Sequence, residues 1–134
     1  MKLLRSAALL FLPALLAAAP PQAPPTKTLT LAAAKKLLVG TWQATDDPNV
    51  RLLISQSRYV EKYKAETTTD RSLMVHNQPC GEVPAAMPAS SIYLNTGETC
   101  YYLVSVSATR LETSPVGGRG NTLSYRRVAA PVRK

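Results

Sequence analysis

The sequence is poor in the residues on which most metal and catalytic sites depend. Among its 134 residues it has one histidine, His76, and two cysteines, which are well separated. These three side chains do not make the ligand set of a zinc site. A catalytic histidine needs a nucleophile and an orienting acid, and no G-x-S-x-G or similar motif is present. The glycine-rich run at 117–121 does not lie between a strand and a helix, so it predicts a hairpin turn and not a phosphate loop. We therefore expect no metal, no cofactor and no enzyme activity.

Acidic residues are also scarce. Sixteen lysines and arginines face eight acidic residues, which gives a formal charge of +8. Such an excess favours anionic surfaces or ligands at low salt, although scattered charges are equally typical of a solvated surface. No basic run is interleaved with aromatic residues, so we expect no nucleic-acid partner.

The first residues are typical of an export signal. Lys2 and Arg5 precede a short apolar run, and alanines follow at 17–19. This layout predicts a signal peptide at 1–19, with an uncleaved membrane anchor as the alternative. Its removal also removes Lys2 and Arg5, so the charge of +8 falls to about +6. We expect a periplasmic or extracellular protein with no stable membrane span after cleavage.

The remaining chain is long enough for one domain. A proline-rich linker is expected at 20–30, because proline lacks the N–H that helices and sheets need. A folded domain is expected at 31–128 and a frayed tail at 129–134. Export favours a disulfide between Cys80 and Cys100, and the alternative is two separate buried thiols.

Periodicity predicts one helix followed by strands. The helix is expected over Thr30–Val39, ended by Gly40. A turn is expected at "TTTD", residues 67–70. The close spacing of short strands is typical of an all-β meander, sandwich or barrel, and no long helix intervenes. The eight expected strands are Gly40–Thr45, Val50–Gln56, Tyr59–Glu66, Arg71–Asn77, Ser91–Leu94, Thr99–Val106, Thr109–Thr113 and Asn121–Val128.

A short helix that leads into Gly40-Thr41-Trp42 and a meander of strands resembles the lipocalins and the wider calycin group. The ending "RGNTLSYRRV" is similar to small bacterial lipocalin-like domain proteins. The resemblance implies an eight-stranded antiparallel up-and-down barrel, closed at one end by a Trp beneath a basic residue of the last strand. Strand parity selects Arg127 for this clasp with Trp42. The Thr-Asp-Tyr type motif of many lipocalins is missing.

Members of that family hold a small apolar molecule inside the barrel, so the resemblance implies binding of a small apolar or amphipathic ligand. The site is then expected at the end opposite the clasp. The alternative for the expected lining residues is that they fill the core. The lining residues are Ile54, Tyr59, Glu61, Tyr63, Tyr102 and Val104.

A second hypothesis is a protein-binding or inhibitor module. The proline-rich segment Gln78–Ser90 is anchored by Cys80, and a loop on a rigid scaffold makes a suitable recognition surface. The basic mature chain is compatible with such a role. The sequence alone does not choose a partner or a ligand.

Overall fold

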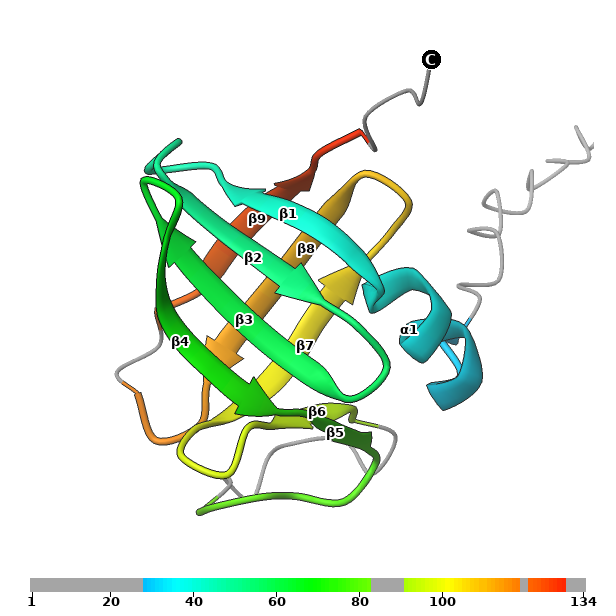
Figure 1. Cartoon of the computed structure of the whole chain (residues 1–134). Coiled ribbons are helices and arrows are strands. Elements are labelled where there is room, and N and C mark those ends of the chain that lie inside the picture. Colours follow the sequence, from blue (N-terminus) through cyan, green and yellow to red (C-terminus); the bar gives the residue numbers. More distant parts are fainter. Residues whose placement is uncertain (1–27, 83–90, 119–120, 130–134) are drawn as a thin grey trace, which may run out of the picture.

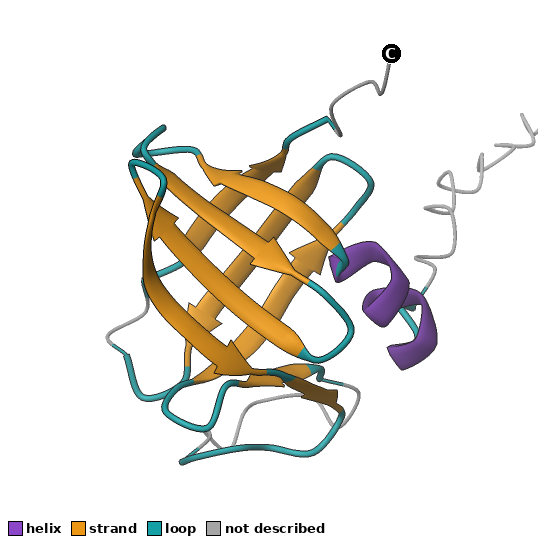
Figure 2. Ribbon diagram, viewed as in Figure 1, coloured by secondary structure: helices purple, strands orange, loops and turns teal. Residues whose placement is uncertain are grey.

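The computed structural model describes residues 28–82, 91–118 and 121–129, which form one short helix and nine strands. The strands make one antiparallel sheet that curls into a nearly closed barrel (Figures 1 and 2). The predicted signal peptide, most of the linker and most of the tail lie outside the described residues. The elements are α1 (Leu31–Leu38), β1 (Gly40–Ala44), β2 (Val50–Ile54), β3 (Arg58–Tyr63), β4 (Glu66–Ser72), β5 (Met74–His76), β6 (Tyr93–Asn95), β7 (Cys100–Val106), β8 (Arg110–Pro115) and β9 (Leu123–Arg127).

Helix α1 begins at an N-cap threonine and packs one face onto the barrel. The Thr30 hydroxyl accepts a hydrogen bond from the Ala33 N–H at 3.2 Å, which satisfies one of the free amides of the first turn. Alanine and leucine then favour the helix. Ala34 and Leu38 are buried against the core. The helix therefore lies beside one end of the barrel (Figure 1).

The sheet order is β4-β3-β2-β1-β9-β8-β7-β6-β5, so neighbours in sequence are neighbours in the sheet. Its two edges are joined covalently, because Leu73 alone separates β4 from β5. The first part of this segment pairs with β3 and the second part pairs with β6. The prediction of an all-β antiparallel barrel with a short N-terminal helix is confirmed. Nine strands replace the expected eight, because the strand across the closure is bent into two.

One predicted turn was misplaced. The chain reverses at Lys64 and Ala65, with φ of 48° and 74°, and β4 then runs through "TTTD". Threonine is β-branched and suits an extended strand. The real turn was hidden because neither of its two residues is glycine or asparagine, the residues that usually adopt positive φ in such a hairpin.

The core fills the centre of the barrel. Alternate residues point inward, so Trp42 lies opposite Leu52 on β2 and opposite Arg127 on β9. Burial removes apolar side chains from water and is the main favourable term of folding. The largest buried side chains of this core are those of Trp42, Leu38, Leu52, Leu94 and Leu111. Tyr93 is buried as well, but it lies outside this cluster.

A disulfide joins Cys80 to Cys100, as predicted. Cys100 opens β7, and the two Cα atoms are 5.5 Å apart. The bond fixes the chain that leaves β5 against the sheet. No free cysteine remains, since the sequence contains two. This covalent link is compatible with export to an oxidising compartment.

Candidate functional site

The helix end of the barrel is closed by a tryptophan–arginine clasp. Trp42 is fully buried, and its indole N–H donates to the Leu38 carbonyl at 2.9 Å. The Arg127 guanidinium lies over the indole, 4.1 Å from the ring centroid. Such a cation–π contact stabilises a fold by roughly 0.5–2 kcal/mol, depending on desolvation. The predicted pairing of Trp42 with Arg127 is confirmed.

The Arg127 guanidinium also satisfies carbonyls that the fold leaves free. Its Nη1 donates to Val39 O at 2.9 Å, and its Nη2 donates to Leu37 O. Its Nε donates to Ala108 O at 2.6 Å, in the β7–β8 turn. The last carbonyls of a helix have no partner within the helix. One side chain therefore ties together α1, the β7–β8 turn and β9.

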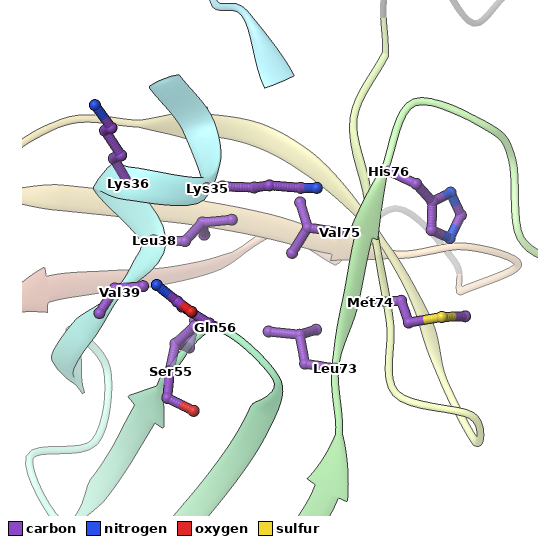
Figure 3. Close-up of a pocket in the computed structure, with 11 residues that line it drawn as sticks. Lys35, Lys36, Leu38, Val39, Ser55, Gln56, Leu73, Met74, Val75 and His76 are labelled. Atoms are coloured by element: carbon purple, nitrogen blue, oxygen red, sulfur yellow. The ribbon is translucent and has the colours of Figure 1, made fainter. Parts of the chain in front are cut away.

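A cleft of about 590 Å³ lies next to this clasp. It is bounded by α1, the β2–β3 turn and the segment that contains β5 (Figure 3). Its lining is mostly apolar. The lining residues are Lys35, Lys36, Leu38, Val39, Ile54, Ser55, Gln56, Leu73, Met74, Val75 and His76. The cleft thus lies at the helix end, whereas the resemblance placed a binding site at the opposite end.

The cleft combines apolar walls with positive charge. Ile54 and Leu73 are buried core residues, and Leu38 joins them from the helix. In Figure 3 the Lys35 side chain extends from α1 toward Val75, whereas Lys36 points away. No aspartate or glutamate is among the described lining residues. A ligand with an apolar body and an anionic group would satisfy both features.

Two of the expected lining residues, Tyr59 and Glu61, face the barrel interior and do not border the cleft. Tyr59 is only 4% exposed and stacks on Tyr101, with ring centroids 5.7 Å apart. Glu61 shares the inward face, since it lies opposite Leu52 in the register. Its Oε1 accepts a hydrogen bond of 3.4 Å from Thr68. Of the expected lining residues, Ile54 alone borders the cleft.

Tyr63 lies at the far end of β3, away from the helix. Its side chain is 43% exposed, and the Lys64 ammonium is 5.4 Å from the ring centroid. This residue follows the inward parity of Tyr59 and Glu61, but the barrel does not enclose it. It is therefore a rim residue.

The expectation that Tyr102 and Val104 face the interior is wrong. Their neighbours Tyr101 and Leu103 pack with the core, and Val104 is 43% exposed. Tyr102 packs against Tyr93 at 6.0 Å on the opposite face of the sheet. Tyr101 and Tyr102 are adjacent and identical, so the sequence shows no alternation of apolar and polar residues at this point. It therefore does not indicate which of the two points inward. A register irregularity between Leu103 and Ser105 shifts the parity further.

A tyrosine cluster occupies the barrel interior, and sequence reasoning found Tyr59 but missed Tyr101 and Tyr125. Burial raises the pKa of Tyr59 far above its ordinary value, and the neighbouring Tyr125 and Tyr101 phenols add to the rise. Burial also raises the pKa of Tyr125, with the Glu61 carboxylate adding to it. The Tyr59 and Tyr125 phenols are therefore neutral at physiological pH, so they offer polar groups without charge.

His76 lies on β5 and belongs to the cleft lining. It lies opposite Tyr93 in the register, and in Figure 3 its ring points away from Val75. Its Nδ1 is buried and has no hydrogen-bond partner among the described residues. The described ranges hold no cluster of three His, Cys, Asp or Glu side chains able to bind a metal ion. Within the same ranges, no helix is long and apolar enough to cross a membrane.

No family model matches the chain, and searches of curated proteins and of solved structures also found no match.

Proposed function

We propose that this chain is an exported, lipocalin-like protein that binds a small amphipathic molecule and performs no chemistry. The cleft beside α1 carries the proposal. Its volume of about 590 Å³ lies in the usual range of small-molecule sites. Leu38, Ile54 and Leu73 of its lining belong to the core, so the barrel holds this part of the wall in place before a ligand enters.

The chemistry of the cleft narrows the ligand class. Val39 and Met74, which are 40% and 61% exposed, offer accessible apolar surface to an alkyl or ring system. The almost fully buried Leu38, Ile54 and Leu73 complete the apolar part of the lining. Lys35 supplies an ammonium group on the helix side, and the described lining holds no carboxylate to neutralise it. A carboxylate or phosphate head would therefore be attracted to Lys35 while its tail displaces water from the apolar wall.

Paired ligands test this proposal. Decanoate and decanol have the same chain length and differ in head-group charge. Isothermal titration should show decanoate binding more tightly than decanol. Lys35→Gln should weaken decanoate binding about fivefold and leave decanol binding unchanged, since an exposed ion pair contributes little more than about 1 kcal/mol.

The matched control is Arg71→Gln. It removes one positive charge from an exposed residue that is paired with Glu98, outside the cleft lining. Decanoate binding should then stay at the wild-type level.

Native mass spectrometry of protein purified from its host should reveal a retained small molecule. Absence of binding to both probes, together with no retained molecule, contradicts the proposal.

The alternative of a protein-binding module has less structural support. Its expected surface is the segment Gln78–Ser90, of which residues 83–90 lie outside the described ranges. Cys80 is tied to Cys100, so the start of the segment is anchored. A pull-down from the native host that yields one stoichiometric protein partner would favour this alternative.

A further inference from the structure

Strand β5 keeps one free edge, and this edge borders the cleft beside α1. The order of the described strands ends at β5, which pairs with β6 on its other side. The three residues of β5, Met74–His76, and the preceding Leu73 all line the cleft. Successive side chains of a strand point to opposite faces, so four consecutive lining residues place the backbone edge itself along the cleft.

Val75 directs its backbone N–H and C=O toward this free edge. In an antiparallel ladder, alternate residues direct these groups to one neighbouring strand, and the residues between them direct theirs the other way. The Leu73 N–H donates to the Ser57 carbonyl at 2.8 Å, and Ser57 lies in the β2–β3 turn and not on β6. Val75 is two residues further on, so its groups point to the same side as those of Leu73.

The pairing of β6 gives the same result. The Leu103 N–H donates to the Ile92 carbonyl, so Leu94, two residues after Ile92, also directs its groups toward β7. Leu94 lies opposite Val75 in the register, and these two residues therefore exchange no hydrogen bonds between β5 and β6. Among the described residues, neither backbone group of Val75 has a backbone partner outside the sheet ladder.

The free edge offers the groups of one residue within the cleft. The Leu73 N–H is already bonded to Ser57, and Asn77 lies beyond the end of β5 and outside the cleft lining. A peptide that adds a strand to a sheet edge forms main-chain hydrogen bonds along several residues. Its further amides would here be buried against apolar side chains without partners, which costs free energy. The edge therefore suits a ligand with a single amino-acid unit.

An N-acyl amino acid carries the groups that match Val75. Opposite residues of an antiparallel ladder exchange two bonds, from the N–H of each to the carbonyl of the other. The ligand amide can donate to the Val75 carbonyl, and one carboxylate oxygen can accept from the Val75 N–H. Figure 3 shows the Lys35 side chain extending from α1 toward Val75, so its ammonium group lies on the side of this carboxylate. The acyl chain is left for the apolar lining, which includes the exposed Val39 and Met74.

We propose that the ligand of this cleft is an N-acyl amino acid, held by two hydrogen bonds to the Val75 backbone and by the Lys35 ammonium group. The inference rests on the proposed function, because it names the ligand class of the same cleft. A fatty carboxylate or an alkyl phosphate has no N–H for the Val75 carbonyl, so neither satisfies the free edge.

Two ligands with the same tail and the same charge test the proposal by isothermal titration. N-decanoylglycine and its ester analogue decanoyloxyacetate differ only in the amide N–H, which the ester replaces by oxygen. N-decanoylglycine should bind about fivefold more tightly, because the ester loses one hydrogen bond. Lys35→Gln should weaken both ligands by the same factor, since both keep the carboxylate. Equal affinity for the amide and the ester would overturn the inference even where decanoate binds, whereas the proposed function fails through the loss of decanoate and decanol binding.

The Val75 N–H is tested by Val75→Pro. Proline is tolerated on an edge strand where the N–H faces away from the ladder. This variant should bind N-decanoylglycine about fivefold more weakly than wild type. The matched control is Val75→Ala, which shortens the side chain and keeps the N–H, and it should lose clearly less affinity. Equal losses in the two variants would contradict the backbone contact.

Hydrogen exchange of the wild-type chain tests the same contact if Val75→Pro does not fold. The Val75 amide should exchange more slowly when N-decanoylglycine is bound, whereas the Leu73 amide, which already donates to Ser57, should not change. An unchanged Val75 amide in the bound protein would overturn the proposal. Acetyl-Leu-Leu-Gly has the same head group and two further amides. Its binding as tightly as N-decanoylglycine would show a peptide site and would overturn the proposal as well.

Discussion

Gly40 leaves open the space that the Arg127 guanidinium occupies. A Cβ at position 40 would lie 2.3 Å from Arg127 Nη1, and the backbone there has φ of +149°. The glycine two residues before the only tryptophan is therefore required for the clasp. Gly40 follows the C-terminal end of α1, and its lack of a side chain leaves space for the Arg127 guanidinium over Trp42.

Replacing Gly40 by alanine should lower the free energy of unfolding by about 3 kcal/mol, since backbone strain and a steric overlap add together. Urea unfolding followed by tryptophan fluorescence measures this change, because Trp42 is the single tryptophan. The control is Gly97→Ala, where φ is +84° and no atom lies within 4 Å of the added Cβ. That variant should lose only about 1 kcal/mol from backbone strain. Equal losses at both positions would contradict the steric role of Gly40.

Arg127 should not tolerate lysine. An ammonium group cannot stack flat on the indole and reach three separate carbonyls at once, so Arg127→Lys should lower the free energy of unfolding by about 2 kcal/mol. Arg126→Lys, on the exposed neighbouring position, should change it by less than about 0.5 kcal/mol. Urea unfolding of the two variants makes the comparison. If both variants lose the same stability, the clasp does not depend on the guanidinium.

At the scale of elements, the β3–β4 hairpin carries strain. Lys64 and Ala65 both have positive φ in a two-residue turn, a conformation that favours asparagine and glycine. Ala65→Gly should therefore raise the free energy of unfolding by about 1 kcal/mol. Ala32→Gly, on the exposed face of α1, should lower it by about 1 kcal/mol. Thermal denaturation should show a higher midpoint for Ala65→Gly and a lower midpoint for Ala32→Gly. A loss of stability in Ala65→Gly would contradict the strain in this turn.

The elements also show how far periodicity reaches. The helix, most strands and the inward parity of Tyr59, Glu61 and Arg127 follow from local patterns. Which residues of β7 point inward does not follow from such a pattern, because Tyr101 and Tyr102 are chemically alike. Local preference cannot choose between two tyrosines, and the packing of Tyr101 against Tyr59 decides the matter.

At the scale of the whole molecule, the buried tyrosines should make the fold sensitive to alkali. Burial raises the pKa of both Tyr59 and Tyr125 above the ordinary value of 10.0. Between the unfolded and folded pKa, the unfolded chain releases protons that the native barrel keeps. The stability is therefore complete below pH about 10 and falls above it by up to about 1.4 kcal/mol per pH unit for each tyrosine.

Urea unfolding from neutral pH to alkaline pH checks this slope. Tyr59→Phe should make it shallower, since one of the two late-ionising phenols is gone. Tyr63→Phe, at a side chain that is 43% exposed, should leave the slope unchanged. An unchanged slope in Tyr59→Phe would contradict burial of a neutral phenol at that site.

The disulfide should stabilise the whole barrel. Closing the loop between Cys80 and Cys100, 20 positions apart, should contribute about 3 kcal/mol through the entropy of the unfolded chain. Cys80→Ser/Cys100→Ser should show that loss in urea unfolding. Thiol titration of denatured, unreduced wild-type protein should detect no free thiol, and two free thiols per chain would reject the bond.

The sequence by itself determined the features that depend on near neighbours: the N-capped helix, the alternating strands and the spacing of Gly40 and Trp42. It also selected Arg127, because parity along a strand is a local property. Tertiary structure alone decided which residues of different strands and of the helix lie next to one another. The cleft beside α1 and the tyrosine cluster arise from register and curvature, which bring together residues far apart in the chain. Such contacts depend on how a closed sheet packs, and no local pattern of residues encodes them.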